Sequence, residues 1–443
     1  MVTPHRSVPG TVRSLRTLQA FHNPQFRLLW PANFFAHISR WSQMTLLSWL
    51  VLDLTGSPWR VALVGASGFA PSLLLGVIGG LLADRMDRKR LMLITQSMNL
   101  AVTVAMTVVL FTGRVEFWHA YVVIFVNGLG SALDMPSRRS VVLDLMGRSA
   151  VTNAIAVDSI GMHTSRMVGP ALAGVLITAV DVSGAYIVVN LFYLTTVLLT
   201  RALQLPPRRT QQAEQVRSQG VARSLAEGFR YVAGQNTILA AVIVTVLMNL
   251  LLFPYQQMVP VIAKNVLDVG PGLMGLLLAS EGFGAFIGAV GIASAANITR
   301  HGRIFLGGSL LSLLAILAFS SSGYYGLSLP ILIVAGLGTS GFGTMQATIV
   351  ILVAREEMRG RALGVMTLAI GASPLGALLV GGLASVLGPI EAVALMTGVG
   401  FVSVAIVGTL MPSLRGRITP DERPQEGPEA PESGSAPEVS RPG

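Results

Sequence analysis

Runs of roughly 18 to 25 predominantly apolar residues, separated by short polar segments, recur along most of this 443-residue chain. An α-helix of about 20 apolar residues crosses the hydrocarbon core of a bilayer and satisfies its own backbone hydrogen bonds there. Only 12% of the residues are charged, which is about half the share that a soluble domain carries. The pattern therefore predicts a polytopic, all-α membrane protein and argues against a soluble enzyme.

The apolar runs divide into twelve predicted transmembrane helices. They lie at residues 28–52, 60–82, 92–111, 117–135, 152–179, 184–205, 237–262, 272–295, 305–321, 328–352, 361–387 and 390–411. A basic segment followed by a helix that Pro and Gly interrupt occurs at residues 141–174 and again at 351–382. Because duplicated halves are common in transporters, we expect two pseudo-symmetric six-helix bundles.

Composition divides the chain into five predicted segments. They are a cytoplasmic N-terminal segment at 1–25, an N-terminal six-helix bundle at 26–205, a cytoplasmic inter-bundle loop with an amphipathic helix at 206–236, a C-terminal six-helix bundle at 237–411 and a disordered cytoplasmic tail at 412–443. The amphipathic helix is expected at 221–232, where apolar and charged residues alternate at helical spacing. The tail is rich in Pro, Glu, Gly and Ser and has no apolar run, which is typical of disorder.

The basic residues determine the predicted orientation. Most of the 31 Lys and Arg residues precede the first span or lie in the even-numbered loops and the tail, whereas the odd-numbered loops hold only Arg60, Arg114 and Lys264. Loops rich in Lys and Arg stay in the cytoplasm, so we expect both termini there, in a protein integral to the inner (cytoplasmic) membrane. The charges are dispersed over many short segments, which favours contacts with membrane lipids and argues against nucleic acid as a partner.

A family resemblance begins directly after the second predicted span. The segment Gly80–Lys89 reads GLLADRMDRK. It resembles the loop signature Gly-x-x-x-Asp-Arg-x-Gly-Arg-Lys of the major facilitator superfamily, with Asp87 in place of the second glycine. The resemblance implies the major facilitator fold.

The same resemblance implies two contacts near the inner ends of the helices. In the superfamily the loop aspartate caps the start of span 11, and a loop arginine pairs with an acid at the inner end of span 4. On this chain Asp84 would cap the helix that begins near Gly360, and Arg88 would pair with Asp134.

Three further segments resemble the branch of this superfamily that includes siderophore and macrolide exporters, the transmembrane secretion effector type. They are Phe26–Trp30, Trp49–Ser57 and Asp134–Pro170. Within the last segment, Gly169-Pro170 is similar to a motif associated with antiporters. The resemblance thus implies a secondary transporter that exports a small molecule.

One face of the first span is polar. Asn33, His37, Arg40, Met44 and Ser48 follow one another at steps of four, three, four and four residues, which places them on one side of a helix. Charged side chains inside a membrane are costly and are functional candidates by default. We expect this face to line the central cavity. The alternative is that His37 and Arg40 hydrogen-bond to carbonyls of neighbouring helices.

Other spans carry polar residues as well. The resemblance implies that spans 1, 4, 7 and 10 line the cavity, so the polar residues of spans 7 and 10 are candidates for substrate contacts, although such side chains also join helices together. Span 5 adds His163, which shares a face with Ser159, Arg166 and Pro170. The candidates in spans 7 and 10 are Asn249, Gln256, Gln257, Ser340 and Thr344.

An acid and an arginine occur at similar depths in two different spans. Glu281 lies about nine residues, or ~14 Å, from the outer end of its span, and Arg166 lies about 14 residues, or ~21 Å, from the inner end of span 5. In a core of about 30 Å these depths nearly coincide. The resemblance implies that spans 5 and 8 face each other across the two halves. We therefore expect Arg166 and Glu281 to form a gating ion pair in one state of the transport cycle.

Burial of a carboxyl group favours its neutral form. Glu281 is therefore the first candidate for the residue that couples transport to protons, and Asp158 in span 5 is the second. In the alternative interpretation, Arg166 and Glu281 form a permanent ion pair that only holds two spans together.

The leading hypothesis is a monomeric, proton-coupled exporter of a small amphipathic drug, siderophore or metabolite that works by alternating access. An uptake symporter and a lipid or lysophospholipid translocator of the same fold are the alternatives. We expect no enzyme activity and no cofactor. The sequence has no Walker lysine, so ATP is not expected to be the direct energy source, and the six histidines are too scattered to suggest a metal site.

Overall fold

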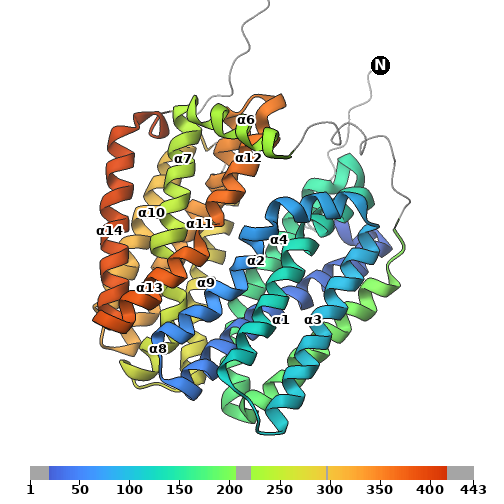
Figure 1. Ribbon diagram of the computed structural model, residues 1–443. Helices are drawn as coiled ribbons and strands as arrows, with labels where there is room; N and C mark the ends of the chain where they lie inside the picture. Colours follow the sequence, from blue (N-terminus) through green and yellow to red (C-terminus); the bar gives the residue numbers. More distant parts are fainter. Residues whose placement is uncertain (1–18, 206–220, 296–297, 417–443) are drawn as a thin grey trace, which may run out of the picture.

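The structure is a computed structural model that describes residues 19–205, 221–295 and 298–416. For residues 74–85, 136, 139, 147–152 and 221–224 it describes the backbone alone. Within the described ranges the chain is helical and contains no strand, as predicted (Figure 1). The longer helices are α1 (Pro24–Thr55), α2 (Pro58–Arg85), α3 (Arg88–Phe111), α4 (Phe117–Ala202), α6 (Val221–Ala233), α7 (Asn236–Leu247), α8 (Tyr255–Asn265), α9 (Pro271–Ser294), α10 (His301–Ser320), α11 (Tyr325–Val353), α12 (Glu356–Ile370), α13 (Ser373–Leu387) and α14 (Pro389–Leu410).

Local sequence explains where the first helices begin and end. Asn23 caps α1 by accepting a hydrogen bond from the Gln25 backbone N–H at 2.9 Å. Gly56 ends α1 in the left-handed conformation, with φ of 60°. Asp87 caps α3, because its side chain accepts a hydrogen bond from the Arg90 backbone N–H at 2.8 Å. The acid that replaces the usual glycine of the loop signature therefore has a structural role of its own.

The predicted spans at 117–135, 152–179 and 184–205 form one continuous helical segment, α4, and the predicted loops between them are helical. A straight helix of 86 residues would be about 129 Å long, far longer than the bilayer is thick. Instead, α4 folds back on itself, as the hydrogen bond from the Tyr193 hydroxyl to Asn127 of the same segment shows. Asp181, with φ of 57°, lies at one reversal; Asp is among the few residues that tolerate this conformation.

Two other predicted spans are each divided into shorter helices. The span predicted at 237–262 consists of α7, a π-helical turn, η3 (Met248–Leu252), and α8. The span predicted at 361–387 consists of α12 and α13. A proline lies directly at each break, Pro254 before α8 and Pro374 in the first turn of α13, and proline cannot donate the backbone hydrogen bond that would continue a helix.

The helices form two bundles. α1 to α4 pack against one another in the first, and α7 to α14 pack against one another in the second. Contacts between the bundles come chiefly from α4 with α9 and from α2 with α13. The bundles meet at the end that contains α8 and diverge toward the end that contains α6 and α12 (Figure 1). We call these the α8 end and the α6 end.

The predicted segments at 1–25 and 412–443 lie mostly outside the described residues, as does the first part of 206–236, so their boundaries stay predictions. A helix, α6, occupies the described part of the inter-bundle segment. It packs against α12, where Glu227 and Arg361 form an ion pair at 3.1 Å.

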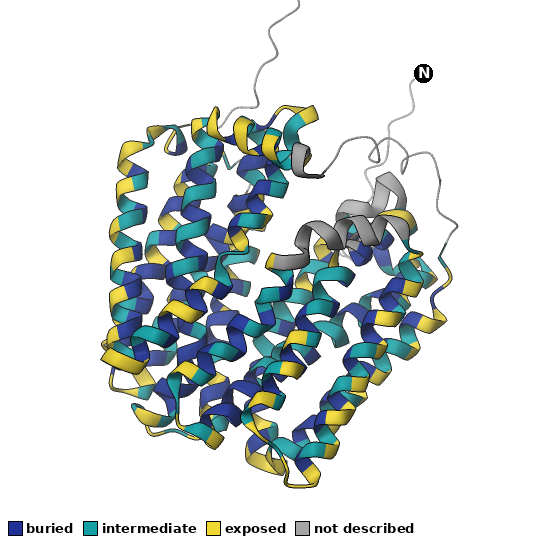
Figure 2. Ribbon diagram, in the orientation of Figure 1, coloured by how far each residue is buried: buried dark blue, intermediate teal, exposed yellow. Residues whose placement is uncertain are grey.

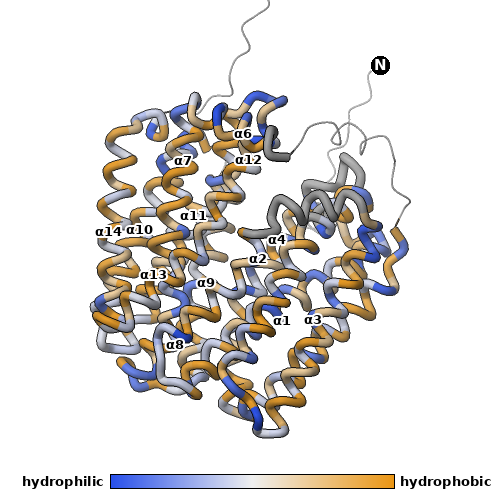
Figure 3. The backbone as a smooth tube through the Cα atoms, viewed as in Figure 1, coloured by the Kyte–Doolittle hydropathy of each residue, from blue (hydrophilic) through white to orange (hydrophobic). Residues whose placement is uncertain are grey.

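The outer surface is apolar over most of the helix length. Large apolar side chains such as Val108, Val180, Leu314 and Val402 are exposed, and the exposed positions lie on the outward faces of the helices (Figure 2). Hydrophilic residues concentrate near the helix ends (Figure 3). Among the described residues, eight helical segments are long and apolar enough to cross a membrane. This surface requires lipid as its solvent.

The two bundles approach closely where α4 passes α9. Gly174 and Gly275 face each other, and a Cβ added at Gly275 would lie 2.5 Å from the Pro170 carbonyl oxygen and 3.0 Å from the Gly174 Cα. Small residues of this kind let helices in membranes pack backbone against backbone. The glycines therefore permit the contact that closes the α8 end.

We predict that Gly275→Ala weakens this contact and lowers the melting temperature of the purified protein by a few degrees, because overpacking costs about 1–3 kcal/mol. The matched control is Gly307→Ala in α10, where an added Cβ meets no atom within 4 Å and alanine favours the helix. Equal melting temperatures for the two variants would contradict the prediction.

Candidate transport site

A cavity lies between the two bundles, and four helices line it. From the first bundle come Trp41, Met44, Thr45 and Ser48 of α1 and Arg166 and Pro170 of α4. From the second come Gln256, Gln257 and Pro260 of α8 and Leu278 and Glu281 of α9. The cavity measures about 30 Å³, whereas drug-sized ligands occupy pockets of about 300–1,000 Å³. In this conformation it holds water-sized molecules and no bulky substrate.

Arg166 and Glu281 meet across this cavity, as predicted. Arg166 Nη2 donates hydrogen bonds to both carboxylate oxygens of Glu281, at 2.9 and 3.1 Å. The side chain of Glu281 is 4% exposed and that of Arg166 is 24% exposed. The pair therefore joins α4 of one bundle to α9 of the other, with the acid enclosed and the arginine partly open to the cavity.

Glu281 has two further hydrogen-bond partners from its own bundle. Gln256 Nε2 donates to Oε2 at 3.1 Å, and the Thr339 hydroxyl donates to Oε1 at 3.2 Å. Arg166 also lies over the Trp41 ring, with 5.4 Å from its guanidinium carbon to the ring centroid, at cation–π distance. Each member of the ion pair therefore also has contacts within its own bundle, Glu281 with Gln256 and Thr339, and Arg166 with Trp41.

The break between α7 and α8 brings the two glutamines to the cavity. Pro254 separates the π-helical turn from α8, which begins at Tyr255, so Gln256 and Gln257 lie in its first turn. Gln257 crosses to the other bundle and packs against Gly65 of α2, where any Cβ would collide with it. π-helical turns often occur at functional sites.

A second polar network lies inside the first bundle. Arg138 donates to the carboxylate of Asp134, four residues earlier in α4, and to the side-chain oxygen of Asn33 in α1. The Asn33 amide donates in turn to Asp158 Oδ1 at 2.7 Å. Gln96 of α3 completes the network by donating to Asp134 Oδ2 at 2.7 Å. Asn33 is therefore a structural link between two charged residues, away from the cavity around Glu281.

The predicted pairing of Arg88 with Asp134 is wrong in this structure. Arg88 forms an ion pair with Asp144, whereas Asp134 Oδ2 accepts hydrogen bonds from Arg138 and Gln96. Arg138 reaches Asp134 because a separation of four residues places the two on one helical face. The side chain of Asp84 lies outside the described residues, so its predicted capping role stays a prediction.

The remaining predicted cavity residues divide into two groups. Met44, Gln256 and Gln257 line the cavity around Glu281, and Arg40 lies one turn of α1 from Met44. The others lie elsewhere: His37 and His163 are partly buried outside the lining, Asn249 and Ser340 donate to backbone carbonyls of their own helices, and Thr344 is exposed.

Three residues of the polar networks were not predicted from the sequence, namely Thr339, Gln96 and Arg138. Nothing in the sequence distinguishes the helix face of Thr339 from that of the adjacent Ser340. Arg138 follows the end of the span predicted at 117–135, but its separation of four residues from Asp134 indicates that the two could pair on a continuous helix.

Comparisons with known proteins agree with this architecture. The chain is 27% identical to an uncharacterized major-facilitator-type transporter, YfiS, of Bacillus subtilis, over 60% of this chain and 63% of that protein. It is 25% identical to the enterobactin exporter EntS of Citrobacter koseri, over 89% of this chain and 93% of that protein. The crystal structure of a mutant peptide transporter, POT, shares the fold at 13% identity, with a TM-score of 0.69 over 89% of this chain and 95% of that chain.

The family assignment covers nearly the whole chain. Residues 16–429 match the family described as transmembrane secretion effector. This family and this fold are those of membrane transporters of small molecules, not of enzymes. The chain therefore belongs to the transmembrane secretion effector family of the major facilitator superfamily.

Proposed function

We propose that this protein exports a small amphipathic molecule in exchange for protons, as a monomer that works by alternating access. The observation that carries the proposal is the buried ion pair of Arg166 and Glu281, which links the two bundles beside a cavity. The export activity of the enterobactin relative supports the direction of transport.

Protonation of Glu281 would loosen the contact between the bundles. A neutral carboxyl group can keep its hydrogen bonds with Thr339 and Gln256, which come from its own bundle. It loses the charge that holds Arg166. Arg166 can leave because it is partly exposed to the cavity and rests on Trp41. Because Arg166 is only partly exposed, losing the charge of its partner disfavours the closed contact and biases the conformational equilibrium.

The orientation follows from charge. Loops rich in Lys and Arg stay in the cytoplasm, and the basic residues Arg355, Arg359 and Arg361 lie at the α6 end. In this proposal the α6 end faces the cytoplasm, together with both termini, and the α8 end faces outward. The bundles are then closed to the outside, where Lys264 and Asp53 also form an ion pair at 2.6 Å, and they diverge toward the cytoplasm.

We predict that Glu281→Gln reduces proton-driven export at least tenfold, since an amide cannot release or accept the coupling proton. Uptake of 2-naphthalenesulfonate, an anion, and of ethidium, a cation, into everted membrane vesicles under an imposed pH gradient measures this. The matched control is Glu391→Gln at the exposed start of α14, which should transport normally. Asp158→Asn tests the second candidate and should have the smaller effect.

Unchanged proton-driven transport by Glu281→Gln would show that Glu281 is not the coupling acid. The ion pair would then be a permanent link between the bundles, and Arg166→Gln would lower the melting temperature without changing the pH dependence of transport.

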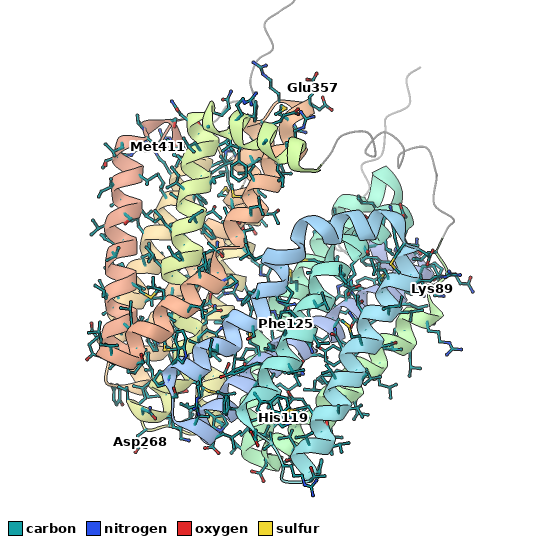
Figure 4. The ribbon with its side chains drawn as sticks, viewed as in Figure 1. Lys89, His119, Phe125, Asp268, Glu357 and Met411 are labelled. Carbon is teal, nitrogen blue, oxygen red and sulfur yellow. The ribbon has the colours of Figure 1, made fainter. Side chains whose placement is uncertain are left out.

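We predict that single cysteines introduced at the two ends react with a membrane-impermeant maleimide from opposite sides. The chain has no cysteine of its own, so each variant reports one position. Glu357 lies at the α6 end, and Asn265 lies close to Asp268 at the α8 end (Figure 4). In intact cells Asn265→Cys should be labelled, and Glu357→Cys should be labelled only after the membrane is permeabilised. The reverse pattern would invert the proposed orientation.

A lipid translocator is the second candidate, because a groove faces the lipid at the contact between the bundles. Its walls are apolar residues of α4 and α9, among them Met167, Leu172, Leu276 and Phe283. Such a groove beside the site could hold an acyl chain. Transfer of fluorescent lysophosphatidylcholine across proteoliposome membranes distinguishes the two functions, since the exporter proposal requires none.

A further inference from the structure

Arg40 is a charged residue in the middle of the membrane with no partner among the described residues. It lies halfway along α1 (Pro24–Thr55). Its Nη1 atom is buried and has no hydrogen-bond partner, and it forms no ion pair with any residue that the structure describes. The guanidinium carbon of Arg40 lies 5.8 Å from the centroid of the Phe69 ring of α2.

The other two arginines of the membrane interior behave differently. Arg138 bonds to Asp134 and Asn33, and Arg166 bonds to Glu281. A guanidinium keeps its positive charge in proteins, and a charge at the centre of a membrane is costly unless something compensates it. Arg40 therefore lacks an anion that the other two arginines have.

Arg40 lies close to the cavity around Glu281, on the same helix as four of its lining residues. It lies one helical turn, about 5.4 Å, from Met44, which lines the cavity around Glu281. Arg40 precedes Met44 in α1, so it lies nearer to the start of that helix. The start of α1 is at the α6 end, where the bundles diverge (Figure 1). Arg40 as a whole is partly exposed although Nη1 is covered. A molecule that enters from the α6 end would reach Arg40 before the Arg166–Glu281 pair.

We propose that Arg40 binds an anionic group of the transported molecule. The substrates are amphiphiles that carry a carboxylate or a comparable oxyanion, whose paired oxygens match the fork of the guanidinium, while the neighbouring Phe69 contacts their apolar part. This inference rests on the proposed export function and narrows its substrate class.

Binding of two matched probes tests the inference. Isothermal titration of the purified protein compares 2-naphthalenesulfonate, a permanent anion, with the neutral 2-naphthalenesulfonamide. We expect the anion to bind about tenfold more tightly, the effect of a hydrogen bond to a charged group, and Arg40→Gln to abolish this preference. The control Arg60→Gln, which changes an arginine stacked on Phe117 at the α8 end, should retain it. The inference is overturned if the anion binds no better than the amide, or if Arg40→Gln keeps the preference.

Stability gives an independent readout. Removing a charge that has no partner should leave the protein equally or more stable, whereas removing a paired charge leaves its partner buried and uncompensated. We therefore expect Arg40→Met to keep or raise the melting temperature and Arg138→Met to lower it by several degrees. A loss in Arg40→Met as large as that in Arg138→Met would assign Arg40 a structural role and overturn the inference.

Transport separates this inference from the proposed function. Proteoliposomes with an imposed pH gradient are tested with 2-naphthalenesulfonate and with ethidium, a permanent cation. If the anion binds through Arg40 but neither probe is transported, the export function fails and the anion site stands. If ethidium is transported and the anion is not, export stands and the anion site is overturned. Transport of the anion that Arg40→Gln abolishes supports both.

Discussion

A charged side chain inside a bilayer must be compensated, and this requirement organises the interior of the protein. Arg138, Arg166 and Arg40 all lie in membrane-spanning helices, yet each meets the requirement differently. Arg138 is compensated inside the first bundle by Asp134 and Asn33. Arg166 is compensated by Glu281 of the second bundle. Arg40 forms no ion pair or hydrogen bond with any described residue, and in our proposal an anionic group of the transported molecule compensates it.

These three solutions correspond to three kinds of behaviour. A charge compensated within one bundle stabilises that bundle and can move with it as a rigid body. A charge compensated across the bundles holds them together for as long as the acid is ionised, and the proposed proton coupling rests on this contact. A charge without a partner supplies free energy for binding, since a ligand anion removes an existing cost.

The arrangement depends on close packing at one end of the molecule. Gly174 and Gly275 allow α4 and α9 to touch backbone to backbone, and only at this short separation can Arg166 reach Glu281 with both oxygens within 3.1 Å. The breaks at Pro254 and at the π-helical turn bring Gln256 to the same carboxylate. The Arg166–Glu281 ion pair therefore depends both on the close backbone packing of α4 and α9 and on the break before α8.

The sequence by itself determined the helical membrane fold, because apolar run lengths and loop charges are local properties that a bilayer converts directly into position. Depth along a helix placed Arg166 and Glu281 at one level, and the family resemblance implied that their two spans face each other. Tertiary structure decided which partner each remaining charge has. Arg88 contacts Asp144 instead of Asp134, whose Oδ2 binds Arg138, four residues later on the same helical face. Rotation about a helix axis and packing against neighbouring helices determine such contacts, and neither can be read from one sequence. For the same reason the sequence could not show that Arg40 would be left without an acid.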